Sequence, residues 1–153
     1  MEMCDLMPQD WVRNDLGEIQ QVVELRESGA MLAYNDIYPY DAIEPIPITA
    51  DILQKNGFEK SDEYFGLLTD KGERWVWRKK DKHYYCLIQV VFLFEPIIDN
   101  SVLVGIDVIN KKSVGTNELR SHDISFVHEL QHALKACGVK KEFVLDDGIR
   151  ESD

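Results

Sequence analysis

The sequence predicts an α+β protein, in which a small N-terminal SH3-like β barrel is followed by an antiparallel β meander packed against one C-terminal amphipathic helix. Two observations support the β parts: short alternating apolar runs fill residues 10–48, and longer ones fill residues 58–109. A third observation supports the helix, because apolar residues recur at spacings of three and four in residues 123–137. With 153 residues, the chain is long enough for one domain or two small lobes.

The first 48 residues contain the short strands of the predicted barrel. Trp11 and Tyr34 have two open interpretations in this region, an aromatic ligand platform or core filling. Four or five short strands in about 50 residues are typical of a small barrel or a curled meander. The strand candidates, with turn sequences between them, are residues 11–12, 17–25, 30–34 and 42–46.

A connector with two prolines separates the predicted lobes. Pro45 and Pro47 stop strand pairing, because proline has no backbone N–H and fixes an extended geometry. Thr49 is positioned to cap a short helix at residues 50–55, which Gly57 is positioned to end. The predicted organisation is a β-barrel lobe at 1–48, the connector at 49–58, a sheet-and-helix lobe at 59–145 and an acidic tail at 146–153.

Longer strands are expected in the second lobe. Polar, turn-like sequences separate them, which predicts an antiparallel meander of three or four strands. Residues 142–145 are expected to return as a short edge strand. The strand candidates are residues 64–68, 73–78, 83–94 and 102–109.

The helix predicted at residues 123–137 is expected to cover one face of that sheet. Ser121 is the expected N-cap residue, and Gly138 is the expected residue after the C-cap. At the helical period, His128 and His132 fall on the polar face, so we expect both histidines on the solvent side. The apolar face contains Val127, Leu130, Leu134 and Cys137, and the polar face also contains Gln131 and Lys135.

The same helix contains a match to the HExxH signature of zinc peptidases, at residues 128–132. In one interpretation the chain is a zinc-dependent hydrolase, with His128 and His132 as zinc ligands and Glu129 as general base. A third ligand would have to lie within the last 153 − 132 = 21 residues, and the extended signature with a third histidine is absent. The favoured interpretation is two exposed histidines on a docked helix, with no zinc or other cofactor and no catalytic residue.

A basic and aromatic cluster lies in the predicted hairpin at residues 75–85. Cations pair with phosphates and aromatic rings stack on bases, so such a cluster indicates binding of single-stranded nucleic acid. The competing interpretation is an ordinary hairpin with a solvated tip. The candidate binding residues are Trp75, Trp77, Arg78, Lys79, Lys80 and Lys82, accompanied by His83, Tyr84 and Tyr85.

Composition narrows the class of partner. The formal charge of 17 − 28 = −11 disfavours nonspecific binding to nucleic acid or anionic membranes and favours a basic protein partner. Cys4, Cys86 and Cys137 show no CxxC spacing, which indicates reduced thiols in a cytoplasm, the last two of them buried. We expect a cytoplasmic location, because no secretory signal is visible and the apolar run at 86–94 is too short to span a bilayer.

Two segments resemble a known family. Residues 43–58 read IEPIPITADILQKNGF, and residues 126–134 read FVHELQHAL. Together they resemble small uncharacterised proteins encoded by phages, prophages and mobile elements of Bacteroides-type gut bacteria. The family's last helix has the pattern VHxLQN, with counterparts here at His128, Leu130 and Gln131. The resemblance implies that the HExxH match is an accident within a structural helix.

These observations favour a noncatalytic accessory or interaction protein of a phage or mobile element, which binds a host protein through an acidic surface. A counter-defence role follows by analogy with that setting. The chain contains no GxSxG, GxGxxG or phosphate-loop motif that would indicate a common enzyme class. The zinc-dependent hydrolase and the single-stranded nucleic-acid binder are the two alternatives.

Overall fold

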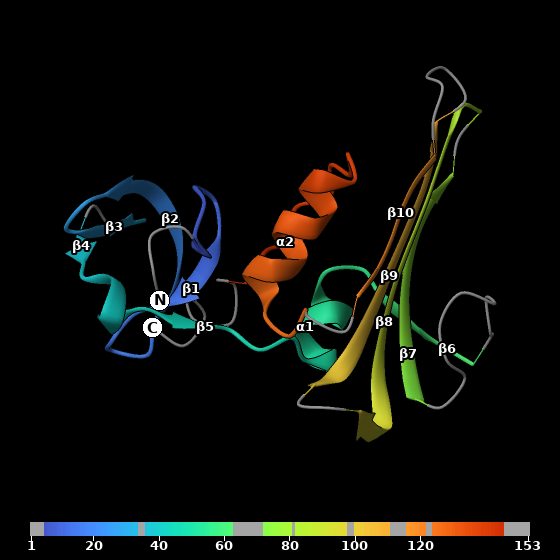
Figure 1. The fold of residues 1–153 in the computed structure, drawn as a ribbon, viewed down its shortest axis with the longest axis horizontal. Coiled ribbons are helices and arrows are strands. Elements are labelled where there is room, and N and C mark those ends of the chain that lie inside the picture. The colour runs from blue at the N-terminus through green and yellow to red at the C-terminus, as the bar shows by residue number, and fades with distance from the viewer. Residues whose placement is uncertain are drawn as a thin grey trace. The chain divides into compact units, whose positions relative to one another are not determined.

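The computed structural model describes residues 5–33, 36–62, 72–80, 82–97, 100–110, 116–121 and 124–145 (Figure 1). Within these residues the protein is α+β, with two antiparallel sheets and two α-helices. The contacts divide the chain into two compact units. Each unit combines stretches that are far apart in the sequence, whereas we expected lobes made of consecutive residues. Unit 1 comprises Met1–Ile48, Phe126–Gln131 and Phe143–Asp153, and unit 2 comprises Thr49–Ser125 and His132–Glu142.

The sheet of unit 1 is a five-stranded meander whose last strand returns to the first. Its strands lie in the order β4-β3-β2-β1-β5, and a 3-10 turn at Tyr40–Ala42 precedes β5. They are β1 (Trp11–Arg13), β2 (Ile19–Arg26), β3 (Gly29–Leu32), β4 (Ile37–Tyr38) and β5 (Glu44–Pro45). The buried apolar core of this sheet consists of Leu6, Val12, Val22, Ala30, Leu32 and Ile43.

The closed barrel predicted for residues 1–48 is not present in the part of the chain that the structure describes. The two edges of the sheet, β4 and β5, are each two residues long, and no pairing joins them. A barrel closes only when its edge strands exchange hydrogen bonds along their length. The sheet is therefore open.

Trp11 fills the core of unit 1, so core filling is correct and the aromatic ligand platform is wrong for this residue. Its side chain is buried, and its Nε1–H donates to the carbonyl oxygen of Phe143 at 2.6 Å.

The edge strand predicted at 142–145 is wrong, because these residues are not in a strand and Phe143 instead buries its ring. Tyr34 and the predicted acidic tail at 146–153 lie outside the described residues.

The sheet of unit 2 is a five-stranded antiparallel meander in sequence order. The strands predicted at 73–78, 83–94 and 102–109 correspond to the central three, and the one predicted at 64–68 lies outside the described residues. The first and last strands were not predicted, because their polar sequences EKS and TNELRS show no apolar alternation. The strands are β6 (Glu59–Ser61), β7 (Gly72–Lys80), β8 (Tyr84–Ile97), β9 (Asn100–Asn110) and β10 (Thr116–Ser121).

Both α-helices end in the same hydrogen-bonded motif. Gly57 follows α1 (Ala50–Lys55) at φ 87°, and Gly138 follows α2 (Val127–Ala136) at φ 77°. Glycine adopts this left-handed conformation without steric cost, and the N–H of the next residue then bonds back into the last helical turn. In α2 this bond joins the Val139 N–H to the Leu134 carbonyl at 2.8 Å. The helix ends predicted at both glycines are confirmed.

Thr49 caps α1 as predicted, since its Oγ1 accepts from the Ile52 N–H at 3.3 Å. In contrast, α2 begins at Val127, later than the predicted residue 123. The Val127 N–H donates to the Ile46 carbonyl at 2.8 Å, which keeps the preceding chain extended, and Ser121 is the last residue of β10 instead of an N-cap.

Neither helix within the described ranges is long and apolar enough to cross a membrane. The apolar face predicted for α2 is confirmed, because Val127, Leu130, Leu134 and Cys137 are all buried.

Gln131 connects α2 to the main chain of unit 1. Its Oε1 accepts from the Trp11 N–H at 3.0 Å, and its Nε2 donates to the Gln9 carbonyl at 3.1 Å. One side-chain amide therefore pairs with two backbone groups at the start of β1.

We predict that Gln131→Ala lowers the free energy of unfolding by about 1–3 kcal/mol, because it removes both hydrogen bonds. Lys135→Ala, at an exposed position of the same helix, is the matched control and is expected to stay within about 0.5 kcal/mol of the wild type. Urea denaturation followed by circular dichroism measures both values. Equal stability of the two variants would contradict this role of Gln131.

Candidate functional site

The charge of the chain is divided unequally between its two units. The residues of unit 1 include 3 Lys and Arg and 15 Asp and Glu, a net charge of 3 − 15 = −12. The residues of unit 2 include 14 Lys and Arg and 13 Asp and Glu, a net charge of 14 − 13 = +1. The acidic excess of the chain therefore belongs to the residues of unit 1.

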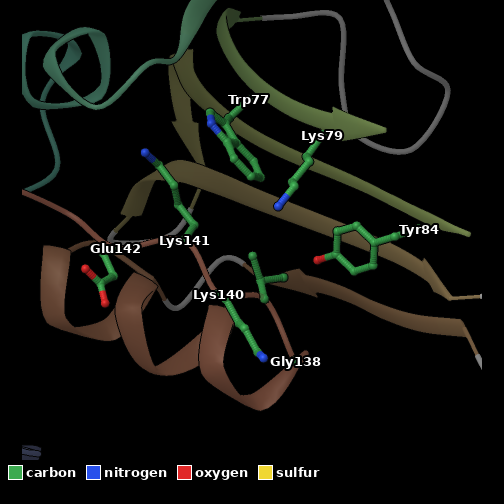
Figure 2. A pocket seen from close by; sticks show the side chains of 8 residues that line it. Trp77, Lys79, Tyr84, Gly138, Lys140, Lys141 and Glu142 are labelled. Carbon is green, nitrogen blue, oxygen red and sulfur yellow. The ribbon is translucent and has the colours of Figure 1, made fainter. Parts of the chain in front are cut away.

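A cavity of about 510 Å³ lies in unit 2. One wall comes from β7 and the start of β8, and the other comes from the segment that follows α2 (Figure 2). We call it the Trp77 pocket. Its lining residues are Trp77, Lys79, Tyr84, Gly138, Val139, Lys140, Lys141 and Glu142.

Strand alternation forms the first wall of the Trp77 pocket. Side chains two residues apart point to the same face of a strand, so Trp77 and Lys79 share a face. Lys79 pairs with Cys86 in the antiparallel register, which puts Tyr84 on that face as well. Figure 2 shows the Lys79 ammonium and the Tyr84 hydroxyl pointing into the space between the two walls.

The helix end forms the second wall. Gly138, in its left-handed conformation, turns the chain out of α2, and the buried Val139 anchors the segment that follows. Lys140 and Lys141 come next and line the cavity. The pocket thus receives cations from a segment about 60 residues beyond β7 in the sequence.

Lys141 lies over the Trp77 ring of the pocket. Its Nζ lies 5.5 Å from the centroid of the Trp77 ring, which is the geometry of a cation–π interaction. Burial lowers the pKa of the Lys141 ammonium below its usual value. The lining contains three lysines and one carboxylate, that of Glu142, so the pocket suits an anion attached to a flat ring.

The remaining residues of the predicted basic and aromatic cluster lie elsewhere. Trp75 is buried, and its Nε1–H donates to Glu73 Oε1 at 2.8 Å. Arg78 and Lys80 alternate to the face opposite Trp77, and Lys82 is exposed beyond the end of β7. The structure therefore brings together Trp77, Lys79 and Tyr84 from the predicted cluster. It adds Lys140 and Lys141, which sequence reasoning missed because no local pattern connects them to β7.

Two of the HExxH residues contact Phe126, the residue before α2. His128 is buried, so its predicted exposure is wrong, and its ring stacks on that of Phe126 with centroids 6.1 Å apart. Glu129 Oε1 accepts from the Phe126 N–H at 3.1 Å, the bond that a capping-box glutamate makes. His132 is half-buried.

No group of three or more His, Cys, Asp and Glu side chains in the described ranges is arranged to hold a metal ion. The zinc ligands His128 and His132 and the general base Glu129 remain a prediction, with no third ligand identified. Cys86 and Cys137 are buried as expected, and burial raises the pKa of each thiol. Cys4 lies outside the described residues.

Comparison with known proteins gives no match to a family model, to a curated protein or to a solved structure. The resemblance to proteins of phages and mobile elements therefore stays a prediction. Inference about function has to begin from the residues of the site itself.

We predict that Glu129→Ala lowers the free energy of unfolding by about 1 kcal/mol, whereas Glu129→Gln stays close to the wild type. The glutamine amide can accept the same bond from the Phe126 N–H, and alanine cannot. Chemical denaturation of the three proteins measures the difference. A glutamine variant as unstable as the alanine variant would contradict the capping role of Glu129.

We predict that the Lys141 ammonium titrates below the ordinary lysine pKa of 10.5, because burial disfavours its charged form. The unfolded chain then holds this proton more tightly, so the contribution of Lys141 to stability rises as pH increases through its lowered pKa toward 10.5. A ¹³C NMR titration of the lysine Cε signals measures the pKa, and Trp77→Ala should raise it by exposing the ammonium. An unchanged pKa in that variant would contradict burial against Trp77 as the cause.

Proposed function

We propose that this chain is a noncatalytic binding protein of a phage or mobile element, that it works in the cytoplasm, and that unit 2 binds single-stranded nucleic acid in the Trp77 pocket. The main support is the Lys141 ammonium, 5.5 Å from the centroid of the Trp77 ring in a cavity lined by two more lysines. Stacking rings and clustered cations are the two elements that single-stranded nucleic acid requires.

The size and chemistry of the pocket agree with a nucleotide as the bound unit. A volume of about 510 Å³ falls within the range of roughly 300–1,000 Å³ that is usual for small-ligand sites. Lysine ammonium groups attract phosphate as point charges, and an indole stacks on any base. We therefore expect binding with little sequence preference.

The overall charge of −11 is the main argument against a nucleic-acid ligand. That argument weakens when the units are counted separately, since unit 2 has a net charge of 14 − 13 = +1. Charges in solution act over about 8 Å at physiological ionic strength, so the charges that line the pocket, three lysines and one carboxylate, matter most to a ligand inside it. The local charge of the pocket thus favours an anion.

A basic protein is the second candidate partner, and unit 1 would bind it. The net charge of 3 − 15 = −12 on that unit supports the acidic surface that we inferred for a host-protein partner. This proposal includes an SH3-like fold for residues 1–48. It is supported by the 3-10 turn before β5 and by the return of β5 to β1. A counter-defence role would follow from capture of a host protein.

We predict that a fluorescently labelled oligothymidylate of twelve nucleotides binds the full chain at low salt. Lys141→Ala and Trp77→Ala should each weaken binding about tenfold or more, because they remove a phosphate contact and a stacking surface. Lys135→Ala, an exposed lysine of α2 outside the pocket, is the matched control and should change affinity less than about twofold. Fluorescence anisotropy measures the affinities, and thermal unfolding verifies that each variant is folded.

Absence of binding by the wild type, or equal losses in Lys135→Ala and Lys141→Ala, would contradict the nucleic-acid proposal. The second candidate then predicts that an oligolysine peptide binds and that Glu27→Gln with Asp41→Asn weakens it. Both residues are exposed on unit 1. Asp51→Asn with Asp62→Asn on unit 2 is the charge-matched control.

A further inference from the structure

A second, polar cavity of about 290 Å³ lies beside the Trp77 pocket in unit 2, and Trp77 lines both. We call it the β7-edge cavity, because it lies where β6 stops pairing with β7. Its lining residues are Gly57, Glu59, Lys60, Ser61, Val76, Trp77 and Arg78.

The geometry of β6 opens this cavity. β6 pairs with β7 only from Ser61 opposite Arg74 to Glu59 opposite Val76. Beyond Val76, the turn at Gly57 approaches the β7 edge in place of a strand, as far as the described residues extend. A Cβ placed on Gly57 would lie 3.6 Å from Trp77 Cδ1, so the backbone at Gly57 reaches the edge of the indole.

Cations line both cavities. In the β7-edge cavity these are the exposed side chains of Lys60 and Arg78, against the single carboxylate of Glu59. In the Trp77 pocket they are three lysines against the single carboxylate of Glu142. Trp77 thus lines two cavities that each contain more cations than carboxylates.

We propose that the β7-edge cavity is a second phosphate subsite, and that one nucleic-acid strand crosses Trp77 from this cavity into the Trp77 pocket. In such a strand every internal nucleoside has a phosphate on either side along the backbone. A base stacked on the indole therefore directs one phosphate toward Lys141 and the other toward the β7-edge cavity, which Lys60 lines from the face of Trp77 and Arg78 from the opposite face. The inference rests on the proposed function and adds that the ligand is a polymer with at least two phosphates.

An acidic peptide would meet the same charges, but it would leave the Trp77 indole without a role. Carboxylate side chains bring no flat ring to Trp77, whereas each nucleotide brings a ring and an anion together. A tryptophan that lines two basic cavities therefore favours a nucleic-acid strand.

The test compares thymidine 5′-monophosphate with thymidylate dimers, tetramers and octamers on the full chain, with uridylate oligomers in parallel. We expect affinity to rise at least tenfold from the monophosphate to the tetramer. Lys60→Ala and Arg78→Ala should each weaken tetramer binding about five- to tenfold and leave monophosphate binding unchanged. Each should also lower the slope of log affinity against log salt by about 0.7, the value for one lost phosphate contact on a single strand.

Lys55→Ala on α1 is the matched control, because Lys55 is exposed and lines neither cavity. If Lys60→Ala and Arg78→Ala leave tetramer affinity and salt slope unchanged while Trp77→Ala weakens binding, the second subsite is wrong and the Trp77 pocket stands. If no thymidylate or uridylate binds the wild type, the proposed function itself fails. Displacement of the tetramer by an oligoglutamate of equal charge as effectively as by unlabelled tetramer would overturn the choice of a nucleic-acid strand.

Discussion

The antiparallel register between β7 and β8 is the constraint on which the candidate site depends. Trp77 pairs with Ile88 and Lys79 with Cys86, and this pairing puts the site residues of both strands on one face. A slip of one residue would turn every side chain of the strand to the opposite face. Ile88 and Cys86 are fully buried on the same face, so a slip would move two core side chains off that face together with the site residues.

The second requirement of the site is the turn at Gly138. Its left-handed conformation and the bond from the Val139 N–H to the Leu134 carbonyl end α2 and direct the chain across the sheet. Val139 is buried, which holds the two lysines that follow beside the strand face. A local rule of helix termination therefore supplies five of the eight residues that line the pocket.

Charge illustrates why a property of the whole chain can mislead about a site. The formal charge of −11 counts against an anionic ligand, yet the acidic excess lies in unit 1. Electrostatic attraction depends on the nearest charges, because salt screens distant ones. The lysines that line the Trp77 pocket belong to different parts of unit 2, and only the fold brings them to one place.

Local signals in the sequence identified three of the four predicted helix-end residues, and Ser121 was the exception. Thr49 caps α1, and Gly57 and Gly138 end the two helices, because each position requires a side-chain acceptor or a positive φ. The long apolar runs of β8 and β9 were also found, since buried strands need them. β6 and β10 were missed, because the pairing of a short polar strand depends on its neighbours and not on its own pattern.

The sequence by itself determined the α+β class, the central strands of the second sheet, the apolar face of α2 and the C-terminal ends of both helices, because near neighbours in the chain encode them. It also identified Trp77 and Lys79 as candidate binding residues. The tertiary structure decided that the first sheet is open, that His128 is buried, and that Lys141 meets Trp77 across 141 − 77 = 64 positions. Contacts of that separation leave no periodic trace in a sequence, since they depend on how the sheet and the segment after α2 pack together.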